Sequence, residues 1–462
     1  MNAVLIWIVF PLAIAVILFL FQRWKQTITL IGTGVALLLA GLAWLYPPDG
    51  AMRLGPWIFE ITDRFSVHGR QIILTHGDRP ILILLYLMAA FWFLGSLAAK
   101  VPAHFVPFGM AATAIMVISI FVEPFYYGAL LFEVVALLFT VLLSVPGKLP
   151  TKGILRFMAF QTLGMVFILL ASWLLNQTHV ETINQTLLKQ ALIAMGLGFA
   201  FLLGIFPFVT WIPMISSQNN SYLAAFMFNI FLNGAILFGL SFLEQYAWVQ
   251  EYIDFSVYFQ IVGAIMLGVG GLLTAFQRNL GRVMGYVVIV GIGHAFLAFS
   301  LGRTGTQTYF ALLIVQICAL GVWSLSLNII YSQLHSLDYS SVAGIAYRLP
   351  FPVIGIFLAN FSLAGLPLLA GFTLYWALGS QLIFQSSLRI TIWLLVASIG
   401  MLGGGLRSIS VLIAREEELP EVEESTNLFK VLLVFGGTFL VIFGMMPHYL
   451  LRFVENLSLV FQ

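Results

Sequence analysis

The chain has 462 residues, of which 61% are hydrophobic and only 8% carry a charge, and its mean hydropathy is +1.04. A water-soluble core cannot accommodate this composition, so it indicates a polytopic protein embedded in a lipid bilayer. The 20 Lys and Arg residues nearly balance 18 Asp and Glu residues, which excludes the strongly basic surface that nucleic-acid binding requires. The sequence contains no phosphate-binding loop, dinucleotide fingerprint or metal-ligand spacing, so we expect neither a cofactor nor a metal site.

Apolar runs long enough to cross a membrane recur along the whole chain, and we count about fourteen. The predicted spans are 3–22, 27–46, 80–99, 104–122, 125–145, 154–176, 187–212, 221–243, 256–276, 282–301, 307–332, 347–385, 388–414 and 427–448. The connections are too short for a soluble domain, so redox or nucleotide chemistry must come from other subunits. We predict an all-α fold with a single membrane domain over residues 1–462.

The alternating connections sort the cationic residues to one side of the membrane. Connections that follow odd-numbered spans hold Arg23, Lys25, Lys100, Lys148, Lys152, Arg156, Arg278, Arg282, Arg348, Arg407, Arg415 and Lys430. The positive-inside rule assigns this side to the cytoplasm. We therefore expect an integral protein of a bacterial plasma membrane, with both termini outside.

Two connections are longer than the others. Segment 47–79 mixes charged residues with aromatic ones, which predicts an interfacial hairpin or an amphipathic connector. Segment 415–424 contains six acids and one arginine. It predicts an exposed acidic connector, with docking to a basic neighbouring subunit as the alternative.

The seventh and twelfth predicted spans contain residues that disrupt helices. These residues are Gly204, Pro207 and Pro213 in the seventh span and Gly365, Pro367 and Gly371 in the twelfth. Interrupted helices at corresponding places in two halves are typical of inverted repeats with an ion path at each break. We therefore predict two inverted five-helix repeats, at about 104–244 and 256–414. Glycine and proline are common in membrane helices, which would explain either break alone but less easily the matched pair.

Glu133 lies in the middle of the apolar run 125–145. An ionisable group near the middle of a bilayer costs ~2.5 kcal/mol or more, so it is usually retained for a function such as proton transfer. The alternative is a neutral glutamic acid whose hydrogen bond joins two helices. The cost favours the functional interpretation, and Glu133 becomes the first proton-transfer candidate.

Other polar residues lie close to the predicted breaks. Asn229 and Asn233 are four residues apart and therefore share one face of the eighth span. With Gln161, Asn360 and Ser362 they can hold a water wire, although interhelical hydrogen bonding is the commoner use of such residues.

Two further side chains are candidates for different reasons. His294 is the one histidine in the middle of a span and can titrate near neutrality; a proton relay and a core histidine with satisfied hydrogen bonds both stay open. Arg407 lies near the inner end of the thirteenth span, which favours snorkelling or pairing.

Four motifs together resemble those of one family. They are 132–133 in the fifth span, GIFPFVTWIP at 204–213, QRNLGRVMGY at 277–286 and AGLPLLAGF at 364–372. They are similar to the antiporter-like membrane subunits of respiratory complex I, which are shared with multisubunit cation/proton antiporters and membrane-bound hydrogenases. Fourteen spans with broken seventh and twelfth helices match the architecture of this family, and the resemblance covers roughly residues 50–450.

The chain departs from this family at its functional residues. In the family, buried lysines pass protons along the middle of the membrane, and the glutamate of the fifth span pairs with one of them. The corresponding lysine positions are Leu202, Asn233, Gly281, Leu320 and Tyr375, and the histidine positions are Val209, Gly291 and Gln316. The missing lysine partner is expected to favour the neutral form of Glu133.

The resemblance implies a non-redox, antiporter-like membrane-arm subunit of a proton-translocating complex I-type NADH:quinone oxidoreductase or a relative. The missing lysines imply reduced proton conduction by the chain itself. Two alternatives stay open: an active subunit of a cation/proton antiporter or membrane-bound hydrogenase, and a purely structural membrane subunit. The expected partners are other membrane subunits, the lipid bilayer, and protons or monovalent cations.

Overall fold

The computed structural model of the chain divides into two compact units. It describes residues 2–45, 51–54, 57–60, 64–67, 69–177, 184–385, 388–415, 427–449 and 454. Unit 1 comprises Met1–Leu94, Val101–Trp211 and Met227–Tyr252, and unit 2 comprises Gly95–Lys100, Ile212–Phe226 and Ile253–Gln462. The division after Tyr252 falls between the two predicted repeats. The single membrane domain and the superposition of its repeats stay predictions, and the acidic connector lies outside the described residues except for Arg415.

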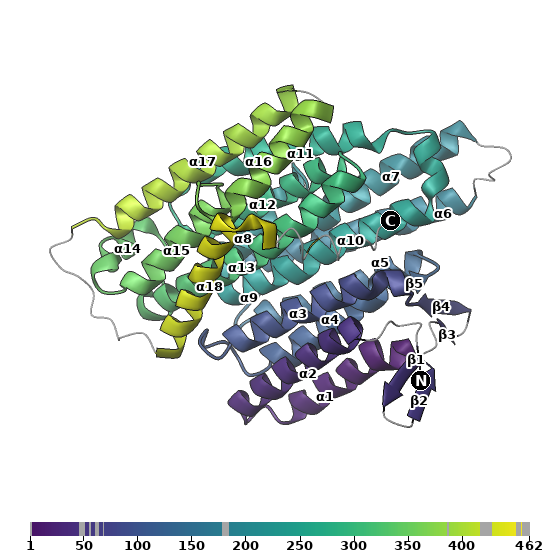
Figure 1. The fold of residues 1–462 in the computed structure, drawn as a ribbon, viewed down its shortest axis with the longest axis horizontal. Coiled ribbons are helices and arrows are strands. Elements are labelled where there is room, and N and C mark those ends of the chain that lie inside the picture. The colour runs from purple at the N-terminus through teal and green to yellow at the C-terminus, as the bar shows by residue number, and fades with distance from the viewer. Residues whose placement is uncertain are drawn as a thin grey trace. The chain divides into compact units, whose positions relative to one another are not determined.

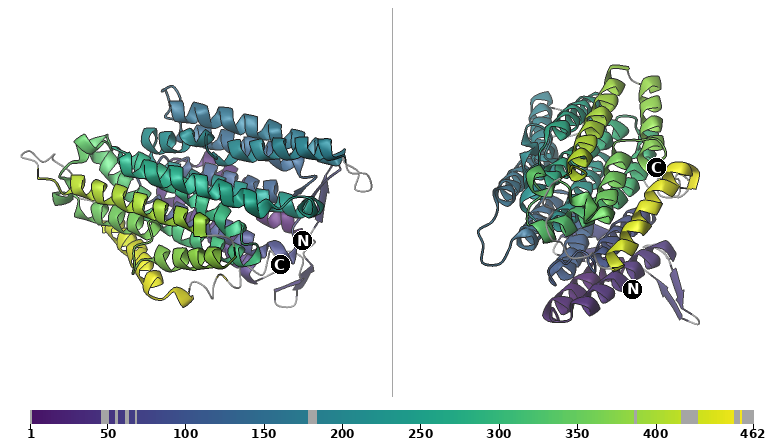
Figure 2. Two further views of the ribbon diagram at one scale, coloured as in Figure 1. Left: turned by 90° about the horizontal axis from the view of Figure 1, so that it is seen from above. Right: turned by 90° about the vertical axis from the view of Figure 1, so that its left-hand side faces the viewer.

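Unit 1 is built mainly from helices (Figure 1). Its helical elements are η1 (Leu5–Val9), α1 (Phe10–Leu20), α2 (Lys25–Leu45), η2 (His76–Asp78), α3 (Arg79–Gly95), α4 (Phe105–Phe121), α5 (Tyr126–Leu143), α6 (Lys152–Asn176), α7 (Gln185–Leu203), η3 (Phe208–Thr210), η4 (Phe228–Leu232), α10 (Asn233–Gln245) and η5 (Ala247–Glu251). Helices α6 and α7 lie side by side along their lengths (Figures 1 and 2). Glycine permits this approach, because a Cβ atom on Gly164 would lie 3.1 Å from the carbonyl oxygen of Gly198.

The described part of segment 47–79 forms short antiparallel strands, as the hairpin interpretation predicted. The strands are β1 (Ala51–Leu54), β2 (Trp57–Glu60), β3 (Arg64–Val67) and β4 (Arg70–Ile73), and β5 is Val122–Glu123. Strand β1 pairs with β2, while β4 lies between β3 and β5. The guanidinium group of Arg70 lies 4.1 Å from the centre of the Tyr127 ring, which attaches the second hairpin to the start of α5.

Unit 2 contains the two helices that directly follow the first break and the helices after Tyr252. They are α8 (Trp211–Gln218), α9 (Ser221–Met227), α11 (Phe255–Phe276), α12 (Leu280–Phe299), α13 (Arg303–Leu334), α14 (Tyr339–Val342), η6 (Ile345–Tyr347), α15 (Pro350–Leu363), α16 (Ala370–Gln385), α17 (Leu388–Leu412) and α18 (Asn427–Met445). Helix α11 packs against both α12 and α17. Its contact with α17 is close, because a Cβ atom on Gly271 would lie 2.5 Å from the Cα atom of Ala397.

The described helices have the lengths and compositions of membrane spans. Ten of them are long and apolar enough to cross a bilayer, or up to eleven if the bent pair Tyr339–Tyr347 and Pro350–Leu363 is one span. Three shorter apolar helices are Leu5–Leu20, Arg79–Gly95 and Phe105–Phe121. The helical membrane architecture is confirmed, whereas the number fourteen stays a prediction.

Both predicted interruptions are present. Helix α7 ends at Gly204, whose φ of 62° is left-handed, a conformation that glycine adopts without a steric penalty. Helix α15 ends just before Gly365, whose φ is 79°. Pro207 and Pro367 lie in the non-helical stretches that follow, so each break combines a left-handed glycine with a proline.

Two of the six residues that were predicted to break helices lie inside helices instead. Pro213 lies in the first turn of α8, and Gly371 lies in the first turn of α16. Proline is tolerated in a first helical turn because its missing N–H has no intrahelical partner there. Gly371 is close to the carbonyl oxygen of Ser362, so it permits a close approach of backbones and does not interrupt the helix.

Candidate functional site

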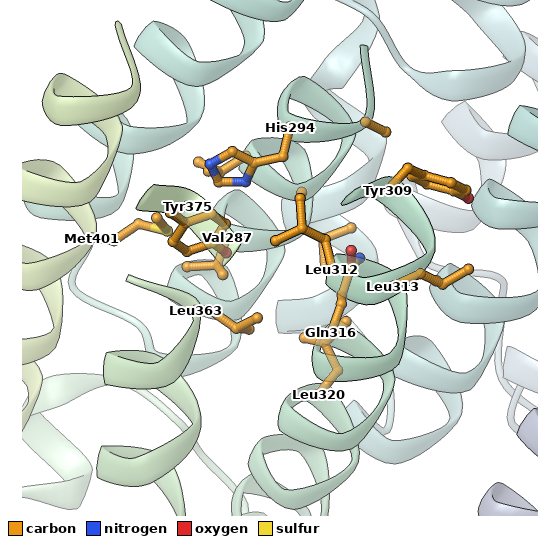
Figure 3. Close-up of a pocket in the computed structure, with 14 residues that line it drawn as sticks. Val287, His294, Tyr309, Leu312, Leu313, Gln316, Leu320, Leu363, Tyr375 and Met401 are labelled. Atoms are coloured by element: carbon orange, nitrogen blue, oxygen red, sulfur yellow. The ribbon is translucent and has the colours of Figure 1, made fainter. Parts of the chain in front are cut away.

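A small cavity lies inside unit 2, where α12, α13 and α17 meet the two halves of the second broken helix (Figure 3). Its volume is about 20 Å³, which is enough for a water molecule. Four polar side chains line it: His294, Tyr309, Gln316 and Tyr375. The rest of the lining is apolar and consists of Val287, Val288, Val290, Gly291, Ala295, Leu312, Leu313, Leu320, Leu363 and Met401.

The cavity brings together positions that the family resemblance singled out in the second half of the chain. Gly291, Gln316, Leu320 and Tyr375 all line it. Gly281 does not: it lies at the start of α12 against the backbone of Ser216. Four positions from three separate helices therefore surround a space in which the family would be expected to hold lysine and histidine.

His294 is the histidine among the residues that line this cavity. Its ring stacks on the ring of Tyr375, with 4.3 Å between the centroids and 22° between the planes (Figure 3). The Nε2 atom of His294 is buried and has no hydrogen-bond partner among the described residues. An unsatisfied buried polar atom costs about 1–3 kcal/mol, and a water in the cavity would satisfy it. His294 is therefore placed to exchange a hydrogen bond with water.

Gly291 explains how the amide of Gln316 reaches the cavity. A Cβ atom at Gly291 would lie 2.9 Å from Oε1 of Gln316 and 3.0 Å from its Nε2. A larger residue at position 291 would therefore displace the amide. Residues 291 and 294 are three apart on α12 and share a face, so the imidazole projects from the same face one turn later.

Replacing Gly291 by alanine is expected to lower the free energy of unfolding by about 1 kcal/mol, because the added methyl group must push the end of the Gln316 side chain away. Thermal unfolding of the purified chain measures this effect. Gly196→Ala on α7 is the matched control, because no atom lies within 4 Å of its added Cβ. Equal melting temperatures for the two variants would show that the Gln316 amide does not pack against position 291.

Glu133 lies half-buried between α5 and α6 of unit 1. Its Oε1 atom accepts a hydrogen bond of 2.8 Å from Oγ1 of Thr162. Its Oε2 atom is buried and has no hydrogen-bond partner among the described residues. Thr162 was not predicted from the sequence, although its place beside Gln161 in the middle of an apolar helix was the available signal. This contact fits both interpretations of Glu133, the interhelical hydrogen bond and the proton-transfer group.

Asn229 and Asn233 meet in a segment of unusual helix geometry. Residues Phe228–Leu232 form the π-helix η4, and Nδ2 of Asn233 donates a 2.9 Å hydrogen bond to the backbone carbonyl of Asn229. Both residues are buried. Single π-helical turns are rare and frequently occur at functional sites, but this stretch contains no glycine or proline that would have predicted one.

The remaining positions of unit 1 are apolar or neutral. Leu202 and Val209, at which the family resemblance implies a lysine and a histidine, are both buried. Gln161 is also buried, and neither Oε1 nor Nε2 of its amide has a partner among the described residues. Gln161 follows Phe157 by one helical turn, and the Phe157 ring packs 4.9 Å from that of Trp211. Unit 1 therefore holds apolar side chains at positions 202 and 209 and a neutral amide at Asn233, where the resemblance implies lysine or histidine.

Asn360 and Ser362 precede the second break but do not line the cavity of unit 2. Both are buried, and their side chains have no partner among the described residues. Asn360 faces α17, since a Cβ atom at Gly405 would lie 2.6 Å from its Oδ1 atom. Nowhere in the described ranges do three or more His, Cys, Asp or Glu side chains form a group that could hold a metal ion.

Known proteins similar to this chain fall into two groups. NADH-quinone oxidoreductase subunit N of Neisseria gonorrhoeae is 26% identical over 271 residues, which is 58% of this chain and 56% of that protein. The corresponding subunit N of a Wolbachia from Brugia malayi is 27% identical over 215 residues, covering 45% of this chain and 44% of that protein. The chain thus spans about half the length of the curated relatives that it matches.

Solved structures match over almost the whole chain. A chain of the Mrp complex from Dietzia has a TM-score of 0.78 at 14% identity, covering 99% of this chain and 96% of that one. A chain of respiratory complex I from Thermus thermophilus with bound NADH has a TM-score of 0.75 at 17% identity, covering 100% of this chain and 99% of that one. At these identities the likeness shows a common fold.

The match to a family covers most of the chain. Residues 81–406 match the family described as NADH:quinone oxidoreductase/Mrp antiporter, TM. This region begins in α3 and ends in α17, so it includes Glu133, both helix breaks and the whole cavity of unit 2. The chain therefore belongs to the NADH:quinone oxidoreductase/Mrp antiporter transmembrane family.

Proposed function

We propose that the chain is an antiporter-like membrane-arm subunit of a complex I-type NADH:quinone oxidoreductase or a close relative. It contributes to proton translocation or to its coupling, with reduced conduction of its own. It assembles with other membrane subunits in a bacterial plasma membrane, with both termini outside. The names of the curated relatives support the complex I type, and the lining of the cavity in unit 2 supports the reduced conduction.

The observation that carries this proposal is the chemistry of that cavity. Proton transfer through a protein needs groups that gain and lose protons near neutral pH, or water held between polar groups. Leu320 cannot gain or lose a proton, and Gln316 is a neutral amide. His294 is the side chain of this lining that carries an imidazole, whose two ring nitrogens can donate and accept hydrogen bonds. Transfer through unit 2 therefore depends on one imidazole and on water.

The side chains of this site have separable roles. Tyr375 holds the plane of His294 by stacking on it, and Gln316 supplies both a donor and an acceptor for water. Leu320 occupies the position at which the family would be expected to provide a lysine, and its side chain is 0% exposed. A dry aliphatic group at this point lengthens the distance that a proton must cross without a carrier.

Leu320→Lys is expected to raise proton flux severalfold, because it adds a titratable amine to the cavity beside Gln316. The measurement is proton uptake by vesicles that contain the assembled complex, followed with a pH-sensitive dye. Leu320→Met is the matched control, since it keeps the volume and adds no charge. Equal flux in all three proteins, with normal assembly of each, would contradict reduced conduction at this position.

The second candidate function is an active subunit of a multisubunit cation/proton antiporter. The likeness to a chain of the Mrp complex from Dietzia favours it, because its TM-score of 0.78 is higher than the 0.74 and 0.75 of two complex I chains. If this second function is correct, a Na⁺ gradient will drive proton movement across vesicles that contain the complex, in the absence of NADH. Co-purification with redox subunits, and no response to Na⁺, would exclude it.

A further inference from the structure

We propose that one end of unit 2 binds an anionic phospholipid, with its phosphate at Arg407 and an acyl chain along α11 and α17. The headgroup site consists of Arg407, Tyr339 and Arg278. The acyl strip consists of Leu272 and Phe276 on α11 and Ile399, Gly403 and Leu406 on α17. The carboxyl-terminal ends of α11 and α17 meet the start of α14 at this headgroup site.

Arg407 is held in place but retains most of its donors. Its Nη1 donates a 3.4 Å hydrogen bond to the carbonyl oxygen of Ala275, and its guanidinium carbon lies 5.8 Å from the centre of the Tyr339 ring. The Tyr339 hydroxyl is itself bonded to Oγ of Ser408 at 2.7 Å. A guanidinium has five N–H donors, and one carbonyl uses one of them. The contacts therefore fix the orientation of Arg407 and leave donors for a ligand.

Carboxylates of the described residues do not neutralise this arginine. Asp338 is the acid next to Tyr339, and it accepts a 2.8 Å hydrogen bond from Nδ2 of Asn279. The contacts of Arg407 in the described part of the chain are the carbonyl and the aromatic ring. A half-buried guanidinium with unused donors prefers a planar or tetrahedral oxyanion, such as a phosphate, to which it donates two parallel hydrogen bonds.

Further arginines add to the positive charge of this end. The carbonyl oxygen of Arg278 accepts a 3.0 Å hydrogen bond from the Tyr339 N–H, so the backbone of Arg278 lies next to Tyr339. Arg278, Arg282, Arg348 and Arg415 are all exposed. By the positive-inside rule this end lies on the cytoplasmic side, where anionic lipids are enriched and nearby arginines attract them.

The acyl strip distinguishes a lipid from free phosphate. Leu272 is 49% exposed, Phe276 71%, Ile399 68% and Leu406 58%, so an apolar surface runs from the middle of the helices to Arg407. Gly403 lies within it: the nearest atom to a Cβ atom at this position would be Cβ of Ala275, at 3.9 Å. A hydrocarbon chain can therefore lie flat over Gly403 while its phosphate reaches Arg407.

The test compares phospholipids of different charge. The full chain, purified in detergent and delipidated, is titrated with phosphatidylglycerol or phosphatidylethanolamine, and retained lipid is quantified by mass spectrometry. Phosphatidylglycerol should be preferred, and Arg407→Gln should weaken its binding about fivefold. Arg156→Gln is the matched control, since Arg156 is an exposed arginine of α6 in unit 1 and should change nothing. Equal retention of both lipids, or equal losses in both variants, would overturn the proposal.

A second variant tests the acyl strip without touching a charge. Gly403→Leu fills the strip over Ala275, where space is available, and should reduce retention of phosphatidylglycerol while the chain stays folded. Unchanged retention would show that acyl contacts do not contribute and would overturn the proposal. Displacement of the lipid by inorganic phosphate at equal concentration would also overturn it, because the site would then be one for free phosphate. Failure of the wild-type chain to bind either lipid would overturn the proposal as well.

Discussion

Gly400→Leu is expected to prevent stable packing of α11 against α17. A Cβ atom at Gly400 would overlap with the carbonyl oxygen of Gly271, and the next nearest atoms are also backbone atoms of that residue. Backbone in the middle of a helix cannot move aside as the end of a flexible side chain can. Overpacking costs about 1–3 kcal/mol even where side chains yield, and here the two helices must separate. We expect the variant to lose most of its folded fraction in detergent.

Gly403→Leu is the matched control for this prediction. It introduces the same side chain three residues later on the same helix, where Cβ of Ala275 at 3.9 Å is the nearest atom. Size-exclusion chromatography after heating should show an intact peak for Gly403→Leu and aggregation of Gly400→Leu. Similar melting behaviour of the two variants would mean that α11 and α17 do not cross at Gly400.

Local signals in the sequence predicted the helix breaks and the hairpins. Gly204 and Gly365 interrupt spans because each adopts a left-handed conformation that other residues avoid. Pro213 and Gly371 carry the same local signal but lie inside helices. Their place depends on where the next helix begins and on which backbone lies opposite, and neither is a property of the residue type.

The composition of the cavity could be predicted only through the family resemblance. Gln316 and Tyr375 lie on different helices, and their approach to Gly291 is a result of tertiary packing. Hydrophobic patterning placed each of them in the middle of a span but did not say which face meets which. The place of His294 beside Tyr375 followed from no pattern, because a single histidine in an apolar helix has no periodicity.

The π-helix at Phe228–Leu232 and the partner of Glu133 were missed for the same reason. The π-helix depends on how α9 continues into α10, and its sequence is compatible with an ordinary helix. Thr162 is a small residue that is common in membrane helices, so its place beside Gln161 was too weak a signal to identify it as the donor to Glu133. Contacts between helices are set by their rotation, and apolar spans with polar residues on several sides do not fix that rotation.

Glu133→Gln is expected to leave proton uptake by the assembled complex near the wild-type rate. A neutral glutamic acid and a glutamine have the same shape, and the amide oxygen can still accept the hydrogen bond from Oγ1 of Thr162, which is 2.8 Å long in the wild type. The family resemblance implies a lysine partner for this glutamate at position 202, where this chain has leucine, so the hydrogen bond to Thr162 is the described contact that the substitution must preserve.

The comparison with Glu133→Ala and Thr162→Val separates structure from proton transfer. Glu133→Ala leaves Thr162 without its acceptor and should lower stability by about 1–3 kcal/mol. Thr162→Val removes the same hydrogen bond but keeps the carboxyl group, so it should share any loss that comes from the hydrogen bond alone. Proton uptake in reconstituted vesicles, with assembly checked for each variant, distinguishes the cases. Loss of uptake in both Glu133 variants, with normal assembly and normal uptake in Thr162→Val, would establish Glu133 as a proton carrier and reject the structural interpretation.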